Sequence, residues 1–329
     1  MDFENRTQSP AWLLRSAGPG TRMYGSLITR TRHQLTEDGA LAPPPTELAL
    51  TDLRRDPLET VYGTFEADDF FPRTGTDVIV LGKAVSEEPV TEMAVRVAAG
   101  SYRVEIRVVG DRVWERRADG ELAPGPPTPF TVMPIRYQNA LGGVTKNEYG
   151  DLPDPNNPVG KGFYLSEGDA LGQPLPNLED PAQPIRAFSD RPAVVGLGPY
   201  PSGWGLRLTK VVTVNPVTAE VTIDPEKGLY DRAHPALSGV RLGAGDTVTL
   251  EGVSLQGRVT FSLPRCPFAV EVMLGATTTR LAPVLEEVLV DLNAGLVDLT
   301  YRKLFKYEMV PYQQRRTVLF AGPEGQSSP

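Results

Sequence analysis

Few side chains in this sequence have the types and spacing that nucleophilic or metal-dependent chemistry requires. The 329 residues include two histidines, His33 and His234, and a single cysteine, Cys266. A nucleophilic Ser or Cys needs a base within hydrogen-bond reach, and the neighbours of His234 supply neither an acid nor a nucleophile that would mark a triad. Cys266 is expected to pack as a small apolar side chain. Two histidines and one cysteine also argue against a Cys/His zinc site, so we predict no catalytic residue and no metal.

Two glycine-rich stretches resemble nucleotide-binding motifs only in part. Gly196 and Gly198 are followed by Pro201, where the dinucleotide-binding fingerprint has a glycine. Gly160-Lys161-Gly162 lacks the upstream glycine and the downstream Ser or Thr of a phosphate-binding loop. Both stretches are therefore expected to be turns, and we predict no cofactor.

Paired carboxylates leave one enzymatic alternative open, because a glycoside hydrolase can place two carboxyl groups roughly 5 to 10 Å apart across a groove. The adjacent pairs in this sequence are Asp68-Asp69, Glu87-Glu88 and Glu286-Glu287. Adjacent residues of a strand point to opposite faces of the sheet. We therefore expect these pairs to be solvated charges, and a carbohydrate-active hydrolase of β-sandwich type is the alternative to a non-catalytic protein.

Charge and composition limit the classes of partner. Lys and Arg total 33 against 41 Asp and Glu, for a formal net charge of -8, and the basic residues are scattered along the chain. This distribution argues against nucleic-acid binding. The N-terminus lacks the apolar core of a signal peptide, and no stretch approaches the roughly 20 apolar residues that cross a bilayer. We therefore predict a cytoplasmic protein without membrane insertion.

Alternation of apolar and polar residues predicts an all-β fold with little helix. Strand-like patterns occupy residues 78–81, 91–98, 102–108, 112–115, 206–214, 221–223, 246–253, 258–263, 269–273 and 277–281. Strands about 8 to 12 residues apart with turns between them are typical of a sandwich or barrel. We predict a sandwich-like antiparallel body in which 1–76 is a hard-to-interpret part, 77–320 is the β-rich domain and 321–329 is a frayed tail.

Residues 281–292 fit two patterns. Leu281, Leu285 and Leu292 belong to a set with helical spacing, yet Val288 and Val290 alternate as in a strand. A turn at 293–295 followed by a strand-like run at 296–304 favours a hairpin. We therefore predict a strand.

The middle third, from about residue 118 to 201, is rich in Pro and Gly and is predicted to form long ordered loops. Within it, the stretch 133–163 has the highest density of residues that need special backbone geometry, among them Gly142, Gly143, Gly160 and Gly162. Apolar residues occur at intervals in this stretch and can pack against the rest of the protein, which a solvated linker cannot do. We expect Asn157 to tie neighbouring segments together, and Gly160 and Gly162 to adopt conformations that a β-carbon disfavours.

Exposed aromatic and arginine side chains often mark protein-binding surfaces. Tyr137, Tyr200, Trp204 and Arg207 are the candidates for partner binding in this chain. The competing interpretation, that these side chains fill the core, is open for each of them.

Short motifs in the chain resemble, in the same order, those of a bacterial domain-of-unknown-function family. The resemblance covers about residues 77 to 302. Its motifs are Asp77-Val78 to Gly82-Lys83-Ala84, Gly110-Asp111-Arg112-Val113-Trp114, Pro134-Ile135-Arg136-Tyr137 to Gly142-Gly143, Asn157-Pro158-Val159-Gly160-Lys161-Gly162-Phe163, Leu175 to Pro181, Gly198-Pro199-Tyr200-Pro201 with Trp204 and Arg207, Phe261-Ser262-Leu263-Pro264 and Tyr301-Arg302. We assign a structural role to Asp111, Trp114, Gly142, Gly143, Asn157, Pro158, Gly160 and Gly162.

The resemblance implies a function, since members of that family act as adaptors of the type VI secretion system. It implies a cytosolic chaperone that binds a secreted effector or toxin and helps to load it on the spike protein VgrG or its PAAR tip. The chain departs from the family pattern at Arg73-Thr74-Gly75 and from Val211 to Tyr230, where an aromatic and acidic segment is largely missing. A third class, a structural component of the injection apparatus, would predict a symmetric oligomer.

Overall fold

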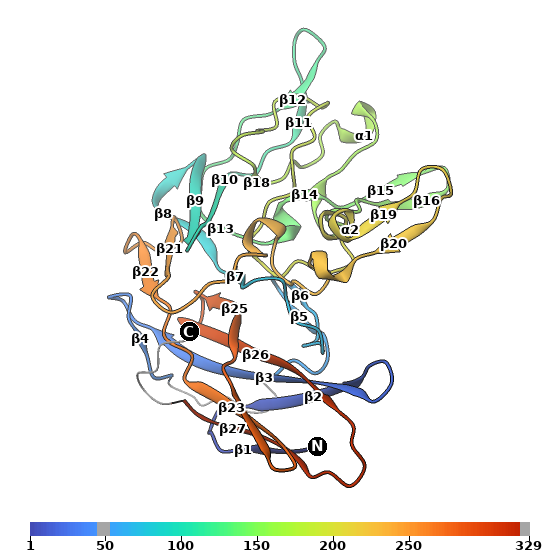
Figure 1. The fold of residues 1–329 in the computed structure, drawn as a ribbon. Helices are drawn as coiled ribbons and strands as arrows, with labels where there is room; N and C mark the ends of the chain where they lie inside the picture. The colour runs from blue at the N-terminus through green and yellow to red at the C-terminus, as the bar shows by residue number, and fades with distance from the viewer. Residues whose placement is uncertain (45–52, 323–329) are drawn as a thin grey trace.

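The structure is a computed structural model and describes residues 1–44 and 53–322. Strands hold 46% of the residues and helices 6%, and the several antiparallel sheets do not close into a barrel. The predicted all-β class is therefore confirmed. Two sheets form a sandwich in the lower half of Figure 1, and a third sheet and the loops of the middle third lie above it.

The sandwich is built largely from the two ends of the chain. Its six-stranded sheet has the order β2–β3–β26–β25–β7, with β4 also paired to β3, and its four-stranded sheet has the order β1–β27–β23–β24. Tyr301 on β26 packs edge-on against Phe268 on β23, with 5.8 Å between ring centroids, so the apolar core lies between these sheets. The strands are β1 (Asp2–Asn5), β2 (Ala11–Ala17), β3 (Arg22–Leu35), β4 (Leu41–Ala42), β7 (Asp77–Leu81), β23 (Phe268–Leu274), β24 (Thr277–Leu281), β25 (Val284–Asp291), β26 (Leu296–Glu308) and β27 (Arg315–Ala321).

Most neighbours in the sandwich are antiparallel, as predicted, but two pairs are not. β1 runs parallel to β27, and β7 runs parallel to β25. The long strands β3 and β26 pair over their whole length, from Leu296 opposite Gln34 to Glu308 opposite Arg22. The first 35 residues therefore contribute strands to both sheets of the sandwich, each beside a strand from the end of the chain.

A five-stranded sheet stands above the sandwich, with the order β18–β10–β9–β21–β22. Its centre is the hairpin of β9 and β10, in which Tyr102 lies opposite Ala99. Buried side chains of these strands join the same apolar core as the sandwich. The strands are β9 (Glu92–Ala99), β10 (Tyr102–Val109), β18 (Leu178–Glu179), β21 (Thr247–Glu251) and β22 (Val259–Ser262).

The middle third contains short hairpins and single helical turns joined by loops. It holds the α-helix α1 (Glu167–Ala170) and the 3-10 turn η2 (Tyr137–Asn139). The α-helix α2 (Gly205–Val211) and the 3-10 turns η3 (Pro225–Lys227) and η4 (Pro235–Leu237) follow it. The remaining two-stranded pairs are β5 (Leu58–Thr60) with β6 (Gly63–Phe65), β8 (Lys83–Val90) with β13 (Phe130–Pro134), β11 (Trp114–Arg116) with β12 (Leu122–Pro124), β14 (Leu141–Gly142) with β17 (Lys161–Gly162), β15 (Val144–Asn147) with β16 (Gly150–Pro153), and β19 (Val212–Val214) with β20 (Val221–Ile223).

Two local predictions have different outcomes. Residues 284–291 form a strand in a hairpin with β26, so the strand predicted within 281–292 is confirmed. The strand predicted over 206–214 is wrong in its first half, because 205–211 is the helix α2. The buried residues Arg207 and Val211 are four apart, which is a helical spacing. Of the predicted frayed tail, residues 323–329 lie outside the described residues.

Candidate functional site

The four residues predicted to bind a partner lie together, but mostly in the interior. The rings of Tyr137, Tyr200 and Trp204 pack edge to face, with centroids 5.1 to 5.5 Å apart. Tyr137 is 1% exposed, Tyr200 is 0% exposed, and Trp204 is half-buried. Burial raises the pKa of Tyr200 to about 12, so its hydroxyl stays protonated. The isolated fold therefore offers little of these aromatic side chains to a partner, and they match the core interpretation.

Arg207 on α2 is also buried and holds the next part of the chain in place. Its guanidinium donates to the carbonyl oxygen of Gly228 at 3.1 Å and to that of Ala233, and lies 3.4 Å from the carboxylate of Asp231. Because residues 212–223 leave the body as a hairpin and return at 228–233, Arg207 fixes the base of that hairpin. Its role is to position this segment.

Asn157 ties two segments of the 133–163 loop together. Its side-chain amide donates to the carbonyl oxygens of Tyr137 at 2.8 Å and Leu141 at 2.9 Å. Its own carbonyl oxygen accepts from the backbone amides of Gly143 and Gly160. These bonds cross-link 137–143 to 157–160 and, together with the short β14–β17 and β15–β16 pairs, explain how this stretch is ordered.

The glycines of this loop are constrained in two ways. Gly142, Gly143 and Gly162 have φ of +141°, +107° and +97°, which L side chains rarely adopt. Gly160 does not share this backbone conformation, contrary to the expectation. A β-carbon on Gly160 would instead lie 2.4 Å from the amide nitrogen of Asn157, so the constraint there is space.

Of the other residues assigned a structural role, Trp114 and Asp111 lie outside this loop and Pro158 lies within it. Trp114 is buried in a small separate apolar cluster, where it packs edge-on against Phe188. Asp111 is exposed, and its carboxylate accepts from the side-chain amide of Asn177 at 3.0 Å. Pro158 is half-buried.

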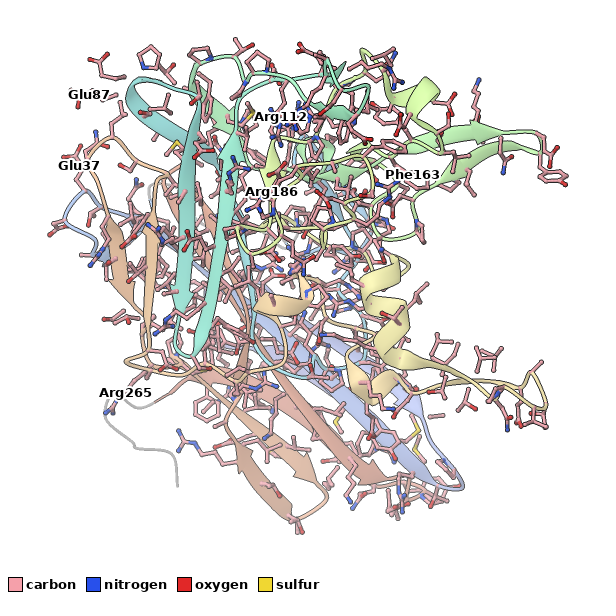
Figure 2. The ribbon with its side chains drawn as sticks, turned by 90° about the horizontal axis from the view of Figure 1, so that it is seen from above. Glu37, Glu87, Arg112, Phe163, Arg186 and Arg265 are labelled. Atoms are coloured by element: carbon pink, nitrogen blue, oxygen red, sulfur yellow. The ribbon has the colours of Figure 1, made fainter. Side chains whose placement is uncertain are left out.

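Two hairpin arms extend from the aromatic cluster into solvent. The β15–β16 arm and the β19–β20 arm project from the same side of the molecule in Figure 1, and Figure 2 shows them as separate extensions in the same direction. They share a base, because the amide of Gly205 in α2 donates to the carbonyl oxygen of Pro155, just after β16. Tyr200 reinforces it with a hydroxyl bond of 2.8 Å to the carbonyl oxygen of Asn156.

The β19–β20 arm carries an apolar face that no other described element covers. Its cross-strand partners are Val212 with Ile223 and Val214 with Val221, so all four side chains lie on one face. Val214, Val221 and Ile223 are 56%, 60% and 58% exposed, and Val217 in the turn is 90% exposed. These residues were not among the sequence candidates. The signal was present as alternation in 212–214 and 221–223, but alternation does not reveal whether another layer covers the apolar face.

The carboxylate pairs behave differently from the prediction. Asp68, Glu286 and Glu287 are buried, so the prediction of solvated charges is wrong for them, while Glu87-Glu88 is exposed as predicted. The register of β25 against β26 shifts between Leu285 and Glu287, which marks a bulge. A bulge breaks the strict alternation of side chains, and both glutamates contact Arg73.

These carboxylates belong to a buried ion-pair network, here named the ionic core. Glu287 contacts Arg54 at 2.7 Å and Arg73 at 2.8 Å, and Glu286 contacts Arg302 at 2.6 Å. None of the side chains is more than 8% exposed, and the positive and negative charges are equal in number. The members are Arg30, Arg54, Arg73 and Arg302 with Asp68, Asp77, Glu286 and Glu287.

The surroundings move the pKa values of two of these carboxyls in opposite directions. Burial opposes ionisation of Glu287, but the guanidinium groups of Arg54, Arg73 and Arg30 overcome it and hold the pKa well below its usual range. Burial dominates at Asp77 and raises its pKa to about 6, against the attraction of Arg73. The ionic core links the segment before β7 to the six-stranded sheet, and we assign it a structural role.

The remaining candidates for chemistry are also enclosed. His234 accepts the amide of Ala236 on Nδ1 at 3.1 Å, and its Nε2 lies 3.0 Å from the carbonyl oxygen of Val194. Burial lowers the pKa of His234 to about 4, and burial raises the pKa of the Cys266 thiol to about 11. A neutral imidazole with both nitrogens engaged and a protonated thiol fit packing roles. Within residues 1–44 and 53–322, no group of three or more His, Cys, Asp or Glu side chains is placed to hold a metal ion.

No helix in the described part of the chain has the length and apolar character needed to cross a membrane.

Comparison with curated proteins and with solved structures finds no match to this chain. A family profile matches residues 21–302, which include both hairpin arms and the ionic core. The chain therefore belongs to the family described as "Uncharacterized protein conserved in bacteria (DUF2169)".

Proposed function

We propose that this protein is a non-catalytic adaptor that binds a type VI secretion effector in the cytoplasm and helps to load it on the VgrG or PAAR spike. The observation that carries the proposal is the uncovered apolar face of the β19–β20 arm. An isolated two-stranded hairpin is marginally stable in water, so an arm with aliphatic side chains on one open face gains stability when a partner covers it.

The position of the arm agrees with a partner-specific role. Residues 212–223 fall within the Val211–Tyr230 segment, where the chain departs from the motif pattern of the adaptor family that it resembles. The base of the arm is held by Arg207 and by the bond from Gly205 to Pro155. A rigid base with a variable arm allows one fold to serve different effectors.

The hydrolase alternative has less support from the geometry. A glycosidase needs an accessible pair of carboxyls, one of them protonated, on either side of the substrate. The carboxylates that the fold gathers in the ionic core are closed to solvent and engaged by arginine side chains. A binding function needs an exposed surface, which the arms provide.

The test is co-purification with the product of the neighbouring toxin gene. The triple variant Val214→Thr, Val221→Thr and Ile223→Thr keeps the β-branched character of the arm and removes its apolar face. Loss of roughly 1 kcal/mol for each buried aliphatic group predicts an affinity about a hundredfold weaker. The matched control is Thr213→Val with Thr222→Val, which changes the opposite, exposed face and should leave the affinity unchanged.

Two results would overturn the proposal. One is that the folded wild-type protein forms no complex with the effector, VgrG or PAAR protein. The other is turnover of a polysaccharide that depends on a pair of carboxylates, which would support the hydrolase instead.

A further inference from the structure

A groove of about 630 Å³ opens at one edge of the sandwich, between β1 and β2. Among residues 1–44 and 53–322, β1 pairs with β27 alone and β2 pairs with β3 alone, so both are edge strands of the described sheets. Figure 1 shows the two strands, in dark blue, running beside each other near the N-terminus. We call this feature the β1–β2 groove, and its lining includes Met1, Phe3, Trp12, Leu13, Arg15 and Arg55.

The side chains that line the groove place it against the free edge of β2. Trp12 and Leu13 are consecutive in β2 and therefore point to opposite faces of its sheet. A cavity lined by both residues lies along the open edge of the strand. From β1, by contrast, the groove takes Phe3 and Asn5, and Met1, which precedes the strand, lies on the same face. The groove thus lies where one more strand beside β2 would stand, with the apolar face of β1 next to it.

The groove also has a local positive charge on a chain whose formal net charge is -8. Arg15 and Arg55 line it, and none of its lining residues is acidic. Arg15 donates to the carbonyl oxygen of Met1 at 3.1 Å, and the guanidinium of Arg55 lies 5.1 Å from the centre of the Trp12 ring. Neither forms an ion pair with a carboxylate of residues 1–44 or 53–322.

We propose that the β1–β2 groove binds an extended acidic peptide segment of another protein, which adds as a strand to the free edge of β2. This mode of recognition draws affinity from main-chain hydrogen bonds and specificity from alternate side chains. Apolar side chains on one face of the peptide would pack on Met1 and Phe3, and the carboxylates on its opposite face would reach Arg55, whose guanidinium lies over the Trp12 ring. The inference rests on the edge and its charge, and it holds whether or not the apolar arm binds an effector.

The charge pattern favours such a peptide over a second copy of this chain. Antiparallel pairing of β2 with β2 would bring Arg15 and Arg55 of both copies to one interface. With no acidic side chain lining the groove, that interface would gather like charges, which is unfavourable. An acidic peptide meets the same surface with opposite charge.

The probe is a fluorescein-labelled peptide of eight residues in which glutamate and valine alternate, with binding followed by fluorescence polarisation. We expect saturable binding by the full-length protein and no binding of the equivalent peptide of lysine and valine. The double variant Arg15→Gln with Arg55→Gln should weaken binding about tenfold. The matched control is Arg6→Gln, because Arg6 is exposed, pairs with Glu4 and does not line the groove.

Strand addition is tested with two N-methylated forms of the peptide. Alternate amides of a strand point to the same edge, so methylating one alternate set should abolish binding while methylating the other should not. Hydrogen exchange should also slow in residues 11–17 when the parent peptide is present.

The proposal is overturned if the glutamate peptide does not bind, if the lysine peptide binds equally, or if both methylated forms bind like the parent. It is also overturned if residues 11–17 are already protected in a dimer of the free protein, since a second copy would then occupy the edge.

Discussion

Replacing Glu287 by Gln should destabilise the protein far more than the loss of an ordinary ion pair. The Glu287 carboxylate lies 2.7 Å from Arg54, 2.8 Å from Arg73 and 3.8 Å from Arg30. Its side chain is 0% exposed, so water cannot replace the lost charge. Removing one partner of a buried ion pair typically costs about 3 to 5 kcal/mol, a large fraction of the roughly 5 to 15 kcal/mol that stabilises a domain.

The comparison variant is Glu105→Gln, which breaks the pair with Arg96 on the surface of the five-stranded sheet. That pair has a similar distance, 2.9 Å, but its side chains are 53% and 41% exposed. Such pairs contribute about 0 to 1 kcal/mol. Urea unfolding followed by tryptophan fluorescence gives the free energy of unfolding of each variant. If Glu287→Gln lost no more stability than Glu105→Gln, the structural role of the ionic core would be refuted.

The same experiment has a pH dependence of known sign. The folded-state pKa of Glu287 lies below its unfolded value of about 4.5, so its stabilisation is present above pH 4.5 and is lost as the pH falls further. The difference between wild type and Glu287→Gln should therefore shrink when unfolding is measured near pH 3 instead of pH 7. A constant difference would contradict the electrostatic explanation.

Three further predictions concern the loop glycines, Asp77 and Cys266. Gly160→Val and Gly162→Val should each lower the free energy of unfolding by about 1 to 3 kcal/mol, while Gly203→Ala, with open space around it, should be nearly neutral in the same urea titration. The folded-state pKa of Asp77, about 6, lies above its unfolded value of 3.8, so the stabilisation by its protonated carboxyl is present below pH 3.8 and lost as the pH rises through 6. When the pH is raised from 4 to 7, the free energy of unfolding of Asp77→Asn should therefore increase by about 2 to 3 kcal/mol relative to that of the wild type. A relative gain of less than 1 kcal/mol would contradict this. The pKa of the Cys266 thiol is raised to about 11, so Cys266 should react with a thiol reagent at pH 8 much more slowly than free cysteine. Equal rates would show that the thiol is more accessible than its half-buried position indicates.

The sequence predicted the local strands well but not their partners. Alternation at 102–108 and the turn at 293–295 identify β10 and the β25–β26 hairpin, because period and turn chemistry act over a few residues. Pairing of β3 with β26 depends on packing between residues 262 to 286 positions apart, which no local pattern encodes. The helix α2 was missed because its apolar residues also alternate over so short a run.

The candidate site was predictable only in part for the same physical reason. The residue types of Tyr137, Tyr200 and Trp204 indicate large contact areas, but type does not distinguish an interface from a core. Glu286-Glu287 was assigned to the surface because the prediction assumed regular alternation, and one bulge changes that alternation. The exposure of the apolar face of β19–β20 depends on the three-dimensional arrangement, in which no other described element covers it.

The pairing of the two chain ends has a consequence for synthesis on the ribosome. Arg30 on β3 bonds to Thr300 on β26, and 270 residues separate them. At a translation rate of roughly 5 to 20 residues per second, β3 emerges roughly 15 to 50 s before its neighbour. During that interval a strand with a buried arginine lacks both its hydrogen-bonding partner Thr300 and Glu287, one of the carboxylates that neutralise it. Nascent chains that stop before residue 296 should therefore be held by chaperones or degraded, and the sandwich should form only after β26 has left the exit tunnel.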